Sequence, residues 1–110
     1  MRVHLIRKET IETFAVNNSR SRSSLHEWLA KIKYADWLTP ADMKETFAGT
    51  DLLGRGSGRV VFDIAGNSYR IIGKYSFGEK SVHLFVCWIG THAQYDQLCK
   101  NSQQYFVSLY

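Results

Sequence analysis

The spacing of apolar residues changes near residue 51, and this change is the strongest constraint on the fold. Before it, apolar side chains recur three and four residues apart, as they do on one face of an amphipathic helix. After it, residues 59–64 place Val60, Phe62 and Ile64 at alternate positions, which predicts a β-strand. We therefore expect a helical first half and a second half built mainly of strands.

Three helices are predicted in the first half. The first is short and centred on residues 11–15. The second opens at Ser24, whose spacing to Glu27 fits a capping box, and continues to about residue 35. The third begins at Thr39-Pro40, with proline at the first helical position, and ends by residue 49. Ahead of them, residues 2–6 favour a strand.

The second half is predicted to be a meander followed by a short helix. Gly66-Asn67 is expected to form a two-residue type II′ turn before a return strand over residues 68–75. A turn at residues 77–80 leads into residues 82–89, an apolar run typical of a central strand. Thr91 and Gln94 have capping-box spacing and open the final helix.

This order of elements predicts one α+β domain over residues 1–110, with N-terminal helices packed on one face of an antiparallel β-sheet, a short C-terminal helix and the other sheet face free. Hydrophobic residues are 45% and charged residues 22% of the chain, as in ordinary globular proteins. No apolar run reaches the roughly 18 residues of a membrane span, so we expect a cytosolic protein without membrane contact. Cys87 and Cys99 lack the spacing of a disulfide framework or zinc site, so we expect packing roles and no metal or cofactor.

Basic residues are concentrated in one stretch of a chain with net charge +4. Arg55, Arg59, Arg70 and Lys74 stand against one acid, Asp63. If the predicted turn closes the hairpin, Asp63 faces Arg70 and Arg59 faces Lys74, all on the exposed side. Like charges directly opposite each other cost stability unless an anion lies between them. The stretch is therefore either a phosphate-binding surface or a solvated basic face.

Two further features are candidates for function. Residues 54–58 form a Gly-rich loop without the ending of a nucleotide-binding loop, so it is either a plain connector or an arm that brings Arg55 to a ligand. His92 follows Thr91 at a helix start, where a phosphate is favoured and an imidazole can exchange a proton near neutral pH. Tyr95, one turn on, can reach the same place. The two are either an active-site pair or a helix-start residue and a core anchor.

Two segments resemble the HigB-type toxins of bacterial type II toxin–antitoxin systems. Residues 59–72 read RVVFDIAGNSYRII and residues 89–96 read IGTHAQYD, in the order of that family. Residues 3–6, the tryptophan-containing second helix and residues 37–47 also fit. The resemblance implies a RelE-like fold and metal-independent cleavage of messenger RNA at the ribosome. It also implies neutralisation by a cognate antitoxin with a helix-turn-helix domain.

By position, the resemblance makes Arg70 and His92 the best active-site matches and Tyr95 the next. Lys74 and Arg59 follow as supporting RNA-binding cations, and Arg55 joins them from the Gly-rich loop. In metal-free RNA cleavage the 2′-OH attacks the adjacent phosphorus, so cations stabilise charge on the phosphoryl oxygens while histidine or tyrosine moves protons. Asp63 departs from the asparagine of many relatives, and its charge opposite Arg70 is expected to weaken phosphate binding.

Two other functions remain open at this point. One is a gyrase-poisoning toxin of the same superfamily, which needs no acid–base pair, and Arg70 and His92 argue against it. The other is an RNA-binding module without catalysis, which needs exposed aromatics, whereas the aromatics here fall mostly on core faces.

The last six residues are rich in aromatic and apolar side chains. We expect residues 105–110 to form an ordered, extended segment that adds a strand to the sheet edge or packs on the helical layer. Alternatively, they belong to the antitoxin interface and order on binding.

Overall fold

The computed structural model describes residues 1–108 and has an α+β architecture. Five strands form one sheet in the order β1-β5-β4-β3-β2. They are β1 (Arg2–Ile6), β2 (Asp51–Leu52), β3 (Arg59–Ile64), β4 (Tyr69–Phe77) and β5 (Ser81–Thr91). The β3–β4 and β4–β5 pairs are antiparallel, as predicted. β2, which was not predicted, pairs antiparallel with β3, whereas β1 lies parallel to β5. The sheet is therefore mixed. The long stretch of chain between β1 and β5, which includes the helices, provides the crossover connection that a parallel pair requires.

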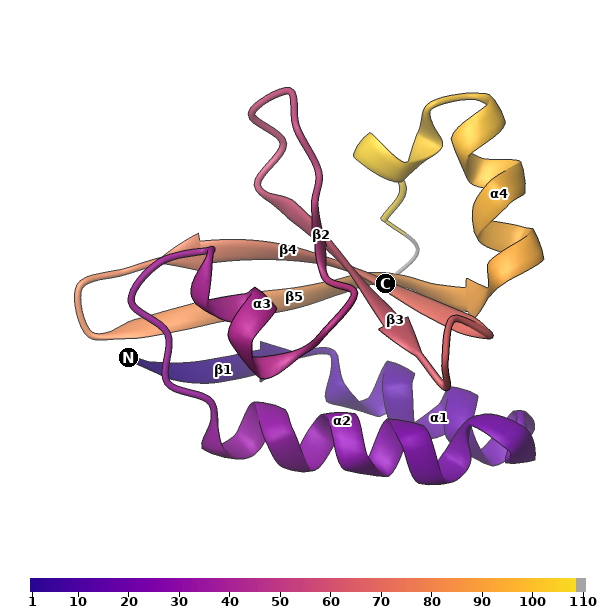
Figure 1. Cartoon of the computed structure of the whole chain (residues 1–110), viewed down its shortest axis with the longest axis horizontal. Helices are drawn as coiled ribbons and strands as arrows, with labels where there is room; N and C mark the ends of the chain where they lie inside the picture. The colour runs from indigo at the N-terminus through magenta and orange to yellow at the C-terminus, as the bar shows by residue number, and fades with distance from the viewer. Residues whose placement is uncertain (109–110) are drawn as a thin grey trace.

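The helices lie on both faces of this sheet. They are α1 (Lys8–Asn17), α2 (Arg22–Tyr34), α3 (Asp42–Thr46) and α4 (His92–Lys100), with short 3₁₀ turns η1 (Ser19–Ser21) and η2 (Gln103–Tyr105). Figure 1 shows α1 and α2 along one face and α4 with η2 on the other. None of the helices in the described part of the chain has the length and apolar character of a membrane span.

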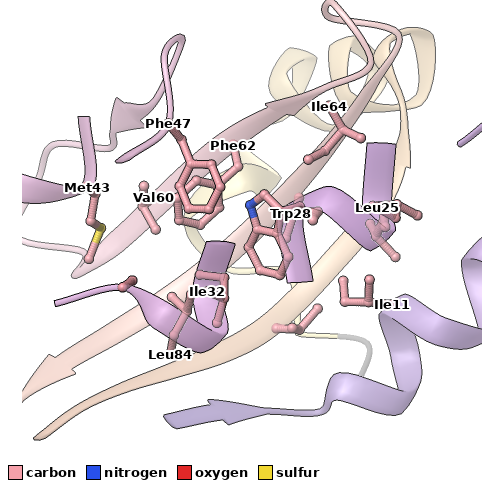
Figure 2. Close-up of a cluster of buried hydrophobic side chains, with 14 of the residues drawn as sticks. Ile11, Leu25, Trp28, Ile32, Met43, Phe47, Val60, Phe62, Ile64 and Leu84 are labelled. Atoms are coloured by element: carbon pink, nitrogen blue, oxygen red, sulfur yellow. The ribbon is translucent and has the colours of Figure 1, made fainter. Parts of the chain in front are cut away.

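The larger core fills the space between α1, α2 and the sheet. Trp28 lies at its centre, where its ring stacks on Phe47 at 5.7 Å between centroids and meets Phe62 edge-on at 5.4 Å (Figure 2). Ile11 from α1 and Leu25 from α2 are fully buried beside them. Truncating a large aromatic residue of such a core to alanine typically costs about 3–5 kcal/mol, so this cluster holds the helical layer on the sheet.

The β3–β4 hairpin has the predicted register. Arg59 pairs with Lys74, and Asp63 pairs with Arg70. The turn type differs from the prediction, because Gly66 and Asn67 both have positive φ, at 60° and 84°. Two positive values define a type I′ turn rather than type II′, and the twist of type I′ also suits a tight hairpin.

The predicted free face of the sheet is covered in part, and this expectation was wrong. Val61 and Ile72, on the same side as Arg70, form a second buried cluster with Trp88 and Tyr95. This cluster forms because apolar side chains in the middle of the hairpin need a cover, which α4 supplies. The predicted packing roles of Cys87 and Cys99 are confirmed, since Cys87 belongs to this cluster and Cys99 packs against it.

The C-terminal segment also packs on this second face. In its described part, up to Ser108, it forms η2 and then an irregular stretch instead of the predicted extended strand, and order over the whole of residues 105–110 stays a prediction. Val107 packs against the second cluster, whereas Phe106 points outward and is 67% exposed. The predicted packing on the N-terminal helical layer is therefore wrong, and Leu109 and Tyr110 lie outside the described residues.

Candidate active site

The end of β5 brings Arg70 and His92 to the same edge of the second face. Gly90 pairs with Arg70 across the strands, and the His92 N–H donates to the Ser68 carbonyl at 3.0 Å. A Cβ at Gly90 would lie 2.5 Å from the Trp88 ring and 2.6 Å from Gln94 Oε1, so only glycine permits this close approach. The start of β4, which carries Arg70, and the junction of β5 with α4, which carries His92, are thereby fixed side by side.

The predicted capping box fixes where α4 begins. The Gln94 N–H donates to Thr91 Oγ1 at 3.2 Å, and the Thr91 N–H donates to Gln94 Oε1 at 2.9 Å. These bonds satisfy two donors that a helix start otherwise leaves without partners. His92 is consequently the first residue of α4 and lies one turn from Tyr95 on the same side of the helix.

The Arg70 guanidinium is held from three directions. Its Nη2 and Nε donate to Asn67 Oδ1 at 2.6 and 3.2 Å, and Nε lies 3.3 Å from Asp63 Oδ1. Its Cζ lies 4.7 Å from the centre of the Tyr95 ring, a cation–π contact. Arg70 is therefore oriented before any ligand binds, while Asp63 neutralises part of its charge.

Sequence reasoning assigned no role to Asn67 in this site. Its side chain reaches Arg70 because the positive φ of the turn turns it back toward β4. The available signal was its place in the family motif, three residues before Arg70.

Asp96 also belongs to the site and was not singled out from the sequence. Its Oδ2 lies 3.2 Å from His92 Nε2, with which it forms an ion pair whenever the imidazole is protonated. The spacing of four residues on α4 is the signal that could have identified it. His92 Nδ1 is buried and has no hydrogen-bond partner among the described residues.

Tyr95 lies beneath Arg70 rather than in solvent. It is 6% exposed, and its ring also contacts Trp88 at 6.2 Å between centroids. Burial, together with a hydrogen bond to the Cys99 side chain, raises the pKa of Tyr95 above its ordinary value. The phenol thus stays protonated at neutral pH and offers its ring, more than its hydroxyl, to the site.

The other predicted cations are not gathered at Arg70. Lys74 is exposed at the far end of the hairpin. Arg59 is only 7% exposed, so its predicted place on the exposed side was wrong: its Nη1 donates to the carbonyls of Val107 at 2.6 Å and Gln104 at 3.2 Å. These carbonyl oxygens supply the negative partial charge that the Arg59–Lys74 pair was expected to require.

Arg55 is likewise engaged by the C-terminal segment. Its guanidinium carbon lies 4.5 Å from the centre of the Tyr105 ring. Within residues 1–108, no group of three or more His, Cys, Asp or Glu side chains is arranged to hold a metal ion.

Comparison with known proteins gives two matches. Residues 21–98 match the family model HigB_toxin, described as the RelE-like toxic component of a toxin-antitoxin system. A curated relative from Escherichia coli O6:H1, named mRNA interferase HigB, is 32% identical over 98 residues, which cover 89% of this chain and 93% of that protein.

Proposed function

The chain belongs to the HigB family of RelE-like toxins, and on this premise we propose that it is an endoribonuclease that cleaves messenger RNA. The observation that carries the proposal is the contact between Arg70 and Tyr95. It holds the guanidinium of Arg70, a β4 residue, against α4, the helix that begins with His92. A positioned cation and an imidazole, both one contact or one helical turn from Tyr95, can supply what phosphodiester cleavage needs, namely charge stabilisation and proton transfer.

The proposed reaction is attack of a ribose 2′-OH on the adjacent phosphorus. His92 moves a proton at the reacting oxygens through Nε2, because Nδ1 is buried, so the exposed Asp96 carboxylate releases Nε2 when the RNA binds. Arg70 stabilises the charge on the phosphoryl oxygens. The phosphorus–5′-oxygen bond breaks, which leaves a 2′,3′-cyclic phosphate and a free 5′-OH. Tyr95 positions Arg70 through its ring, and Lys74 and Arg55 contact the RNA, while Arg59 holds the C-terminal segment.

Further parts of the proposal concern the setting of the reaction. We propose that cleavage requires no metal, takes place on translated messenger RNA at the ribosome in the cytoplasm, and is blocked by a cognate helix-turn-helix antitoxin. We also propose that residues 1–110 act as one toxin domain, because the larger core joins Trp28 of the first half to Phe62 of the second.

The direct test is cleavage of a labelled messenger RNA by the purified protein, compared between RNA that is being translated on ribosomes and free RNA in the same buffer. We expect ribosome-dependent cleavage that leaves a cyclic phosphate. Arg70→Ala and His92→Ala should each lower the rate by roughly 100-fold or more, with melting temperatures near that of the wild type.

Matched controls are Arg20→Ala and His26→Ala, which change exposed residues of the same types outside the site. Both should cleave at the wild-type rate. Full activity of the Arg70 and His92 variants would show that the active site lies elsewhere, and products that carry a 3′-OH and a 5′-phosphate would contradict attack by the 2′-OH.

A further inference from the structure

A pocket of about 500 Å³ lies on the second face of the sheet, at the opposite end of the β3–β4 hairpin from Arg70. We call it the basic pocket, and its defining residues are Arg7, Arg59, Lys74 and Phe85. Three of its lining residues come from neighbouring strands, because Arg59 pairs with Lys74 and Lys74 pairs with Phe85. Arg7 reaches it from the turn between β1 and α1.

Two of the cations in the basic pocket have no ion-pair partner among the described residues. Three cations line it, and the described lining includes no carboxylate. Arg59 is already bonded to the carbonyls of Gln104 and Val107. Arg7 and Lys74 have no ion-pair partner among residues 1–108, so an anion bound between them would relieve their mutual repulsion.

The apolar part of the basic pocket is an exposed aromatic ring. Phe85 is 40% exposed although β5 is a central strand, paired on both sides by β1 and β4. The cover of α4 and the C-terminal segment lies over Val61, Ile72 and Trp88 and leaves this ring open. An open aromatic ring next to lysine and arginine is the combination with which proteins bind single-stranded nucleic acid, by stacking on a base and pairing with phosphate.

We propose that the basic pocket binds one nucleotide of a single-stranded RNA, with Arg7 and Lys74 on its phosphate and Phe85 stacked against its base. This inference rests on the proposed function, because it extends the path of the RNA beyond the reacting phosphate at Arg70. Arg70 and Lys74 lie four residues apart on one side of β4, which corresponds to about 13 Å at 3.3 Å per residue. The pocket therefore holds a nucleotide other than the one that reacts.

The test is the affinity of the purified protein for a fluorescent 2′-O-methyl oligoribonucleotide, which lacks the attacking hydroxyl, measured by anisotropy over a range of salt concentrations. The variants are Lys74→Gln and Arg7→Asn, the latter chosen because asparagine tolerates the φ of 77° at this position. Each should weaken binding roughly fivefold or more and lower the slope of log K against log salt by about 0.7, the value for one lost phosphate contact on a single strand. Lys44→Gln on α3 is the control and should bind as the wild type does.

Phe85 is tested by two substitutions that separate stacking from folding. Phe85→Leu should weaken RNA binding roughly fivefold at every salt concentration, since stacking is not an ionic contact. Phe85→Trp keeps an aromatic ring and should bind RNA as the wild type does. Melting temperatures of both variants establish that they are folded.

The outcomes distinguish this inference from the proposed function. Unchanged affinity and salt slope in the Arg7 and Lys74 variants, with RNA cleavage intact, would overturn the nucleotide site and the RNA contact of Lys74, but not the cleavage chemistry at Arg70 and His92. If these variants bind RNA normally but escape neutralisation by the antitoxin, the pocket is a protein contact and the inference is wrong. Failure of the wild-type protein to bind or cleave any RNA would overturn both.

Discussion

On the proposed function, Arg70 stabilises the reacting phosphate only if its guanidinium is oriented before RNA binds, and three neighbouring residues contact that guanidinium. Asn67 fixes two of its nitrogens and the Tyr95 ring supports the guanidinium plane from below. Orientation of this kind lowers the reorganisation needed in the transition state. Asp63 acts in the opposite sense, because a carboxylate 3.3 Å away competes with phosphate for the same cation.

Tyr95 provides a test of whether its ring or its hydroxyl matters. Tyr95→Phe keeps the surface on which Arg70 rests, so cleavage should stay within about threefold of the wild-type rate. Tyr95→Leu removes that surface and should lower kcat by roughly tenfold or more while KM changes little. Single-turnover kinetics of the three proteins measure the difference, and a large loss in the phenylalanine variant would assign proton transfer to Tyr95.

Asp63 should limit the strength of phosphate binding. Asp63→Asn retains a hydrogen-bond acceptor for Arg70 but removes the competing charge, so RNA should bind a few-fold more tightly at low salt. Anisotropy titrations of both proteins against the same uncleavable RNA check this. Weaker binding by the asparagine variant would show that the carboxylate serves mainly to position Arg70.

At the scale of elements, α4 and the C-terminal segment together cover the second sheet face. Removal of residues 105–110 exposes the cluster that Val107 joins and leaves Arg59 without its Val107 carbonyl. We expect this deletion to destabilise the isolated toxin by about 1–3 kcal/mol, the typical cost of a buried donor without a partner. Thermal melting measures it, and the exposed Phe106 provides the control, since Phe106→Ala should leave the melting temperature almost unchanged.

The same deletion discriminates between the two roles considered for the segment. An unchanged melting temperature for the isolated toxin, with a weaker antitoxin complex, would mean that the segment is a binding surface and contributes little to the fold. Melting with and without antitoxin provides both values.

The elements that local patterns control were predictable from the sequence. Alternation and a two-residue turn gave the β3–β4 register and the Asp63–Arg70 pair, and the Thr91–Gln94 spacing gave the start of α4. The start of α2 was misplaced at Ser24, because the 3₁₀ turn η1 leads directly into a helix that begins at Arg22. The Ser24–Glu27 spacing therefore falls inside the helix.

Features that depend on tertiary contacts were not predictable in the same way. The cover over the second face follows from how α4 and the C-terminal segment fold back, although the apolar side chains of Val61 and Ile72 indicated that a cover was needed. The burial of Arg59 depends on backbone carbonyls more than 40 residues away, which no spacing rule reveals. Arg70 and His92 could be proposed as site residues because both lie in short motifs, whereas Asn67 and Asp96 are connected to them through side-chain contacts that only the structure shows.

At the scale of the whole molecule, the two faces of the sheet have separate tasks. One face carries the helical layer of α1 and α2 (Figure 1) and the larger core. The other face carries Arg70 and His92 at one end and the basic pocket at the other. The net charge of +4 favours approach of an anionic polymer to this second face. The arrangement fits a substrate that extends past α4 from the reacting phosphate to Lys74.

The most direct test of the central claim is to induce the protein in bacteria without its antitoxin and map transcript 5′ ends by primer extension. New 5′ ends within translated messenger RNAs, together with growth arrest, are expected for the wild type and should be absent for Arg70→Ala and His92→Ala at equal protein levels. Growth arrest with intact transcripts and accumulated gyrase–DNA adducts would contradict messenger-RNA cleavage and identify a gyrase-poisoning toxin instead.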